Sequence, residues 1–185
     1  MIRILNGALS KLIFFIENII TCIPCNKKSN QIALVRLDNI GDFVIWLDTA
    51  KEYRNLYPNQ KITLIANPTW AGLARKLPYW DEVFVVDIPH LALKKLIKRW
   101  RLLISIRRLG FDTAIQPTFS RTIAGDSIVR ATGARHRIGS VGDLVNSTAQ
   151  ERQISNRWYT KLLPANNSQM MELLRNAEFS SSLAA

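Results

Sequence analysis

Short runs of aliphatic and β-branched residues recur along this chain, separated by segments with helical patterning. The runs are Ile32–Leu37, Lys61–Ala66, Val83–Asp87, Asp112–Gln116 and His136–Gly139. They follow one another at intervals of roughly 20–30 residues, which is the spacing of successive strand–helix–strand units. They do not alternate strictly between apolar and polar residues, as expected of strands covered on both faces. The sequence therefore predicts an α/β fold, with a Rossmann-like parallel sheet flanked by helices.

The segments between these runs predict the helices. We expect helices over residues 43–56, 69–76, 91–109, 120–131 and 170–179. Gly110 ends the third of them, because glycine readily adopts the left-handed conformation that closes a helix. The stretch between residues 140 and 169 has no clear periodicity, and no further strand is predicted there.

In a parallel sheet, ligands gather where strands end and loops lead into helices. The sequence has four such places, at residues 38–42, 67–69, 87–90 and 116–121. Neither G-x-G-x-x-G nor G-x-x-x-x-G-K-[ST] follows any of the predicted strands. This absence argues against a nucleotide-binding Rossmann domain, since both motifs wrap phosphates with glycine-rich backbone.

Asp42 is the candidate catalytic residue, at the mouth of the first strand. A carboxylate in a cleft can take a proton from a sugar hydroxyl if it lies within hydrogen-bonding reach. Gly41, just before it, lets backbone or substrate approach closely because it has no side chain. The alternative is that Asp42 is the N-cap of a helix that begins at Phe43, a position that aspartate favours.

Several arginines could hold phosphate or carboxylate groups through paired hydrogen bonds. They are Arg36, Arg121 and the cluster Arg135-His136-Arg137. The alternative for all of them is an ordinary solvated surface.

The chain carries a net charge of +11, which favours anionic partners. Basic residues concentrate in the predicted helix 91–109, at Lys94, Lys95, Lys98, Arg99, Arg101, Arg107 and Arg108. A basic amphipathic helix is suited to an anionic membrane surface. The alternative is a helix that packs on the core with a soluble outer face. We expect no nucleic-acid partner, because no known RNA-binding signature accompanies the charge.

Residues 1–28 predict an amphipathic leader helix. Apolar residues recur at three-or-four spacing, at Ile2, Leu5, Leu9, Leu12, Ile16, Ile19 and Ile23. Lys11 and Glu17 interrupt the run, so it is too short for the ~20 apolar residues of a membrane span. We favour an interfacial helix; the alternative is a helix that packs on its own domain or on a partner. Cys22 and Cys25 are interpreted as two reduced thiols, because an isolated C-x-x-C is a weak metal or redox signal.

An ordered series of motifs resembles glycosyltransferase family 9, the lipopolysaccharide heptosyltransferases. It begins with I-A-L-V-R-L-D-N-I-G-D-F-V-I-W-L-D from Ile32 and continues with K-I-T-L-I-A-N-P from Lys61. F-D-T-A-I-Q-P-T-F-S-R from Phe111, R-I-G-S-V-G-D from Arg137 and M-E-L-L-R-N-A-E-F from Met171 complete it. The resemblance runs from about Ile32 to Phe179, and the series is more specific than any one motif.

The resemblance implies a GT-B enzyme of two Rossmann-like domains that inverts the anomeric configuration without a metal. It matches Asp42 to the catalytic base and Arg36 to a basic residue that helps to hold the acceptor. We expect the other acceptor-binding residues at the same strand ends: Asn39, Gly41, Asn67, Gln116 and Arg121. No cofactor and no metal is expected.

The same resemblance divides the chain into the leader 1–28, a Rossmann-like acceptor-binding domain 29–165 and the start of an interdomain helix 166–185, after which the chain is truncated. A nucleotide sugar such as ADP-heptose would bind a missing C-terminal domain, which a second polypeptide could supply; alone, this chain is expected to transfer no sugar. The expected partners are a lipopolysaccharide core or other glycan acceptor and the anionic surface of the inner membrane, with a cytoplasmic, peripheral location. The alternative function is a catalytically silent peripheral membrane-binding module.

Overall fold

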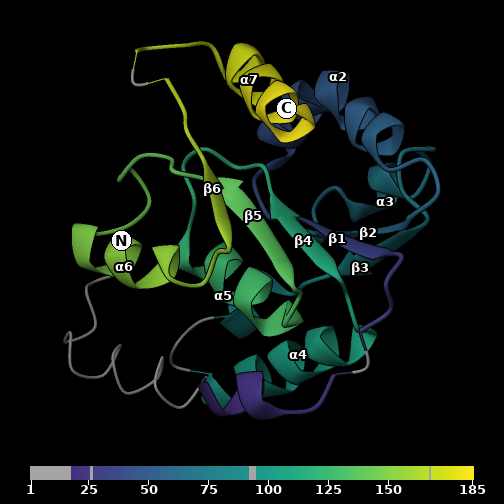
Figure 1. Cartoon of the computed structure of the whole chain (residues 1–185), viewed down its shortest axis with the longest axis vertical. Helices are drawn as coiled ribbons and strands as arrows, with labels where there is room; N and C mark the ends of the chain where they lie inside the picture. The colour runs from purple at the N-terminus through teal and green to yellow at the C-terminus, as the bar shows by residue number, and fades with distance from the viewer. Residues whose placement is uncertain (1–17, 26, 92–94, 167) are drawn as a thin grey trace.

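The computed structural model describes residues 18–25, 27–91, 95–166 and 168–185 (Figure 1). Most of the predicted leader helix, and Lys94 of the predicted basic helix, lie outside these residues. The last part of the leader is described: residues 18–22 are helical, and Ile20 is buried against the domain. For residues 18–22, the alternative that the leader packs on its own domain is therefore correct. Among the described residues, no helix has the length and apolar character needed to cross a membrane.

The centre of the molecule is a six-stranded parallel sheet with the order β3-β2-β1-β4-β5-β6. The strands are β1 (Gln31–Arg36), β2 (Lys61–Ala66), β3 (Glu82–Val85), β4 (Thr113–Gln116), β5 (His136–Ser140) and β6 (Lys161–Leu163). Every neighbouring pair runs parallel. The Rossmann-like α/β fold predicted from the sequence is confirmed.

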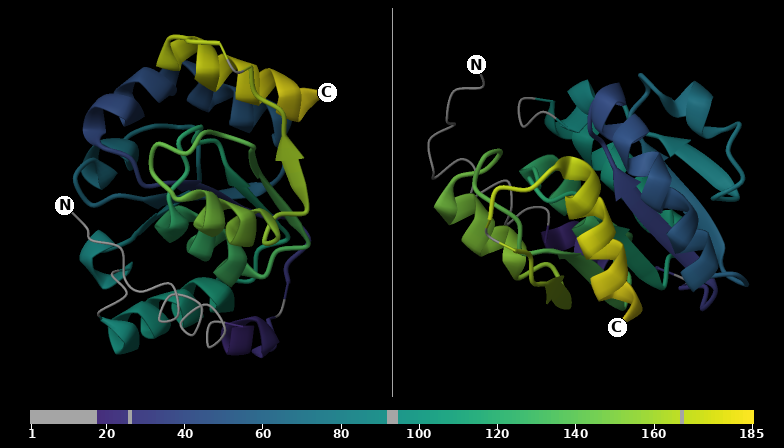
Figure 2. Two further views of the ribbon diagram at one scale, coloured as in Figure 1. Left: turned by 90° about the vertical axis from the view of Figure 1, so that its left-hand side faces the viewer. Right: turned by 90° about the horizontal axis from the view of Figure 1, so that it is seen from above.

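Helices cover both faces of this sheet (Figures 1 and 2). They are α2 (Ile40–Leu56), α3 (Ala71–Ala74), the 3₁₀ helix η1 (Ile88–Leu91), α4 (Leu96–Leu109), α5 (Ile123–Thr132), α6 (Ala149–Asn156) and α7 (Glu172–Ala184). Helices α2 and α7 pack side by side on one face, while α4 and α5 pack together on the other.

Each face has its own hydrophobic core, because successive residues of a strand point to opposite faces. In β1, Ile32 and Leu34 pack beneath α2, α3 and α7, whereas Ala33 and Val35 pack beneath α4 and α5. The first core is rich in aromatic rings: Phe43 stacks on Trp70 with ring centroids 4.0 Å apart. This packing fixes α2 over the sheet and so fixes where its first turn lies.

The structure corrects several predictions about the elements. Strand β6 and helix α6 were not predicted. Leu91, the first residue of the predicted helix 91–109, is the last residue of the separate 3₁₀ helix η1, and α4 itself starts only at Leu96. Gly110 does close α4, with φ of 78° in the left-handed region.

The predicted basic helix does not present all of its charges to solvent. Arg99 exposes 1 % of its surface and donates to Ser127 Oγ at 2.8 Å, and Arg107 is also buried. Conversely, the apolar Ile97 is 70 % exposed. The helix therefore has a mixed outer face around Lys95, Ile97 and Lys98, with two of its arginines turned into the domain.

Candidate functional site

The strand order reverses between β1 and β4, which is where parallel sheets of this kind bind ligands. From β1 the chain continues to β2 and β3 on one side, and β4 to β6 lie on the other. The loops that leave the two strands meet across this point: Thr118 Oγ1 donates to Asp38 Oδ1 at 3.4 Å. The residues that follow β1 therefore lie at the centre of the carboxyl edge of the sheet.

Asp42 lies at this edge in the first turn of α2, and it is exposed. The helix begins at Ile40, with Asn39 as its N-cap. The alternative that Asp42 caps a helix starting at Phe43 is therefore wrong. A carboxylate in a first turn is stabilised by the positive end of the helix dipole. Asp42 is thus an ionisable group at the switch point that can meet a ligand from solvent.

Asn39 and Gly41 lie shortly before Asp42 and are exposed as well. The N-cap side chain of Asn39 makes no capping hydrogen bond. A Cβ atom at Gly41 would meet nothing within 4 Å, so packing inside the chain does not require a glycine here. Both positions leave the approach to Asp42 open.

Arg36, the last residue of β1, has a side chain with 0 % exposure. The expectation of a solvated surface is wrong for it. Its Nε forms an ion pair with Asp38 Oδ2 at 2.8 Å, and its Nη1 donates to Asn176 Oδ1 at 3.1 Å. The guanidinium also lies 5.0 Å from the ring centroid of Trp46 and 3.7 Å from Glu172 Oε1. We call these residues the Arg36 network.

Within this network Arg36 also holds the first turn of α2, because its Nη2 donates to the backbone carbonyl of Asp42 at 3.4 Å. Arg36 therefore positions the carboxylates of the edge from beneath.

The acids of the Arg36 network have perturbed pKa values. Burial raises the pKa of Asp38; the charge of Arg36 opposes this rise, and the charge of Asp42 adds to it. Burial also raises the pKa of Glu172, again against the effect of Arg36. Acids with raised pKa values beside an exposed carboxylate are typical of functional sites.

Asn67, at the end of β2, is 7 % exposed and braces the loop after β1. Its Nδ2 donates to the carbonyl oxygens of Leu37 at 3.0 Å and Asp38 at 3.2 Å. Trp70 Nε1 donates to the same Asp38 oxygen at 2.8 Å. Asn67 thus shapes the edge that carries Asp42 by fixing the backbone beside it.

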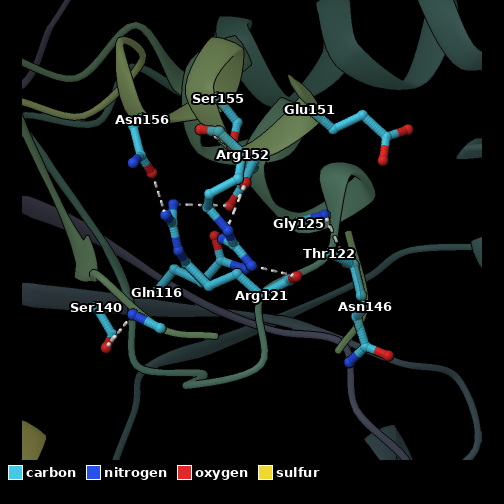
Figure 3. Close-up of polar contacts among 12 residues, drawn as sticks. Gln116, Arg121, Thr122, Gly125, Ser140, Asn146, Glu151, Arg152, Ser155 and Asn156 are labelled. Atoms are coloured by element: carbon cyan, nitrogen blue, oxygen red, sulfur yellow. Dashed lines mark hydrogen bonds and ion pairs between the residues drawn. The ribbon is translucent and has the colours of Figure 1, made fainter. Parts of the chain in front are cut away.

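Gln116 and Arg121, at the end of β4, belong to a second buried cluster, part of which Figure 3 shows. Arg121 is fully buried, so the solvated alternative is wrong for this residue too. Its Nη1 lies 3.2 Å from Asp126 Oδ1, and its guanidinium lies 4.5 Å from the ring centroid of Tyr159. Its Nη2 also donates to Asn156 Oδ1.

Tyr159 completes this cluster, with its hydroxyl within hydrogen-bonding distance of Gln116 and Asp126. Burial, followed by the charge of Asp126, raises the pKa of Tyr159 well above its ordinary value. Arg152 Nη2 donates to the carbonyl of Arg121 at 3.0 Å. These residues form the Arg121 network, which ties β4, α5 and the segment after α6 together.

The structure therefore separates the predicted site residues into two groups. Asn39, Gly41 and Asp42 are exposed at the carboxyl edge, with Arg36 and Asn67 beneath or beside them. Gln116 and Arg121 belong to the closed Arg121 network.

Asp38, Glu172 and Asn176 were not predicted as site residues. Asp38 lies four residues before Asp42 in the same motif, so a second carboxylate near Asp42 could have been predicted from the sequence. Nothing local marked Glu172 and Asn176, since Asn176 lies 140 residues from Arg36 along the chain. Cys22 and Cys25 are free. Within the described ranges, no three His, Cys, Asp or Glu side chains are grouped to hold a metal ion.

Comparison of the sequence with models of protein families and with curated proteins gives no match. Solved structures do resemble the fold. A glycosyl transferase family 9 protein from Veillonella parvula superposes with a TM-score of 0.65 at 15 % identity, over 86 % of this chain and 42 % of that one.

Two Escherichia coli structures are similar as well. The heptosyltransferase WaaC with ADP-2-deoxy-2-fluoro heptose gives a TM-score of 0.62 at 16 % identity, over 83 % of this chain and 48 % of its own. ADP-heptose lps heptosyltransferase II gives a TM-score of 0.56 at 16 % identity, over 81 % of this chain and 40 % of its own. This chain spans less than half the length of each, and over that span it has the fold of the family 9 glycosyltransferases.

Proposed function

We propose that this chain is the acceptor-binding part of an inverting glycosyltransferase. It would transfer heptose, or a related sugar, from a nucleotide sugar to a lipopolysaccharide or other cell-envelope glycan. The observation that carries the proposal is Asp42, an exposed carboxylate at the point where the strand order reverses. The family 9 fold and the motif that contains Asp42 support the choice of reaction.

In this proposal Asp42 is the general base. It takes the proton from an acceptor hydroxyl as that oxygen attacks the anomeric carbon of the donor sugar. The bond between that carbon and the nucleotide diphosphate breaks, and the diphosphate leaves with its electrons. Attack opposite the leaving group inverts the configuration. The other residues of the Arg36 network are positioning residues, because Arg36 holds Asp38 and the backbone of Asp42.

The surface around Asp42 is suited to a second, donor-binding domain. Large apolar side chains are exposed near the carboxyl ends of the strands, at Ile40 and Val44 of α2, Val145 after β5, and Met171 and Leu174 by α7. Exposed apolar groups that gather in one region mark interaction surfaces. A donor domain packed here would bring the nucleotide sugar to the Asp42 carboxylate, in the same chain or in a second one.

The test combines this chain with the C-terminal domain of a family 9 heptosyltransferase, ADP-heptose and a lipopolysaccharide core acceptor. We expect ADP release that requires both polypeptides and the acceptor. Asp42→Asn should lower the rate at least about 100-fold, since a general base contributes at least that much. Asp48→Asn, which changes another exposed acid of the same helix, should leave the rate unchanged.

Two outcomes would contradict the proposal. Full activity in the Asp42→Asn protein would remove this residue from catalysis. No transfer with the unmodified chain, in a mixture where an intact heptosyltransferase turns over, would contradict the proposed activity itself.

A peripheral membrane role is the second candidate, and the outer face of α4 favours it. Ile97 is 70 % exposed between the exposed Lys95, Lys98 and Arg101. An apolar side chain among cations suits the boundary of an anionic bilayer. The proposed location is the cytoplasmic surface of the inner membrane, where a glycolipid acceptor would be met.

Flotation with vesicles that contain phosphatidylglycerol tests this role. Binding should fall in an Ile97→Asn, Lys98→Gln variant and persist in Lys51→Gln, which removes an exposed charge from α2. Equal flotation of the two variants would argue against this face as the contact.

A further inference from the structure

A cavity of about 720 Å³ lies at the amino edge of the sheet, opposite the edge that carries Asp42. Its walls come from residues 18–25 and 27, the ends of α4, α5 and α6, the start of β5 and the segment after α6. Among the described residues that line it, five are basic: Lys27, Arg107, Arg130, Arg137 and Arg157. We call it the basic pocket. The proposed glycosyl transfer does not use it.

The described lining of the basic pocket contains no acidic side chain. The like charges influence one another: burial lowers the pKa of Arg137, and the charge of Arg107 lowers it further. Folding Arg107, Arg137 and Arg157 around one space costs electrostatic free energy, which a bound anion would offset. The charge balance of the pocket therefore favours an anionic ligand.

Arg107 is the most buried of these cations, with only 7 % of its surface exposed. Its Nε donates to the carbonyl of Ile23 at 2.7 Å, and its Nη2 donates to that of Thr21 at 2.6 Å. Its Nη1 is buried and has no hydrogen-bond partner among the described residues. A buried donor without a partner is costly, so this N–H is a specific place for a ligand oxygen.

Gly133 makes room for that donor. It ends α5 with φ of 62°, and a Cβ atom there would lie 2.1 Å from Arg107 Nη1. Any side chain at this position would push the guanidinium away from the pocket wall.

Arg137 and Arg130 are held in place as well. Arg137 Nε donates to the carbonyl of Trp158 at 2.5 Å, and its Nη1 donates to that of Ala134. Arg130 lies over the ring of the same Trp158, 4.7 Å from its centroid. Arginines held in place before a ligand arrives lose little conformational entropy when it binds. The pocket is therefore preorganised.

We propose that the basic pocket binds a phosphate-bearing ligand, with a phosphate oxygen accepting from Arg107 Nη1 and with Arg137 and Arg157 completing the cationic wall. Guanidinium groups match the geometry of phosphate oxygens, and the volume lies within the range of small-molecule sites. A soluble phosphorylated metabolite and the headgroup of an anionic phospholipid share this chemistry.

Isothermal titration of the full chain with inorganic pyrophosphate tests the proposal. We expect saturable binding that weakens at least about tenfold in a Lys27→Gln, Arg157→Gln variant, since a hydrogen bond to a charged group contributes that much. These two residues are partly or largely exposed, so the variant should fold, as its circular dichroism would verify. Lys51→Gln with Arg75→Gln removes the same charge from exposed positions away from both the pocket and the outer face of α4, and should bind as the unmodified chain does.

Vesicles distinguish the two sources of phosphate. Pyrophosphate binding without pocket-dependent flotation on phosphatidic acid vesicles indicates a soluble ligand. Flotation that the pocket variant loses and that pyrophosphate displaces indicates a headgroup. The proposal is overturned if neither probe binds, if the pocket variant binds as well as its control, or if an RNA oligonucleotide binds and pyrophosphate does not.

Discussion

Two buried arginines, Arg36 and Arg121, have the same kinds of partner but lie in different surroundings. Each has 0 % side-chain exposure, and each lies near a carboxylate and over an aromatic ring. The acid beside Arg121, Asp126, is also buried, whereas the acids beside Arg36 are not: Asp38 is 16 % and Glu172 38 % exposed. The Arg121 network is closed and structural, while the Arg36 network opens onto the candidate site.

The largest effect on stability is expected from Arg121→Met. It removes the nearer of the two guanidinium groups beside buried Asp126, leaving only Arg152 Nη1 at 3.8 Å from Asp126 Oδ2, and breaking a buried ion pair costs about 3–5 kcal/mol. Urea unfolding, followed by circular dichroism, measures this loss. A cost near zero would show that water reaches Asp126 and that the Arg121 network is not closed.

Arg36→Met should cost less, about 1–3 kcal/mol, because Asp38 and Glu172 are partly solvated and can recover hydration. The same unfolding experiment compares the two variants directly. Equal losses for Arg36 and Arg121 would remove the distinction between an open and a closed network.

The pH dependence of stability tests the Arg36 network, which is the open one of the two. Burial raises the pKa of Asp38 in the folded protein despite Arg36, so the folded state holds this proton more tightly than the unfolded chain. Stability from this group is fully present below its unfolded pKa, near 4, and is lost as pH rises through the folded value. Asp38→Asn should therefore flatten the fall in unfolding free energy as the pH rises from about 4. An unchanged slope would contradict the raised pKa.

The smallest effect on stability is expected from Asp42→Asn. Its carboxylate is exposed, and it loses only its interaction with the helix dipole, worth at most about 1 kcal/mol. Thermal unfolding should barely change while transfer in the reconstituted system is lost. A larger loss of stability would mean that Asp42 supports the fold and is not reserved for chemistry.

The sequence was sufficient to predict elements that are long and uniform in pattern. The strand Lys61–Ala66 was predicted with its observed bounds, because its last five residues are apolar or β-branched and the strand-breaking Asn67-Pro68 follows them. Strand β6 has only three residues, and α6 is mostly polar, so neither produces a hydrophobic pattern. The capping box of Thr148 and Glu151 was present in the sequence and could have marked the start of α6.

The candidate site was also predicted only in part from the sequence. Asp42 was identified because its motif is contiguous. The burial of Arg36 and Arg121 was not, because a positive charge ordinarily indicates solvent exposure. Asn176 and Asn156, which accept hydrogen bonds from these two arginines, are brought to them only by the tertiary fold, from other elements of the chain.

The link between Arg36 and Asn176 joins the first strand to the last helix of the described fold. Helix α7 also supplies Glu172, so the dielectric surroundings and the local field at the carboxyl edge depend on how that helix is seated. Because the charges of Arg36, Asp38 and Asp42 all act on the pKa of Glu172, a shift of α7 along the sheet would change the acidity of Glu172. We therefore expect a mechanical displacement of the last helix to be registered as a change in proton affinity beside the first strand.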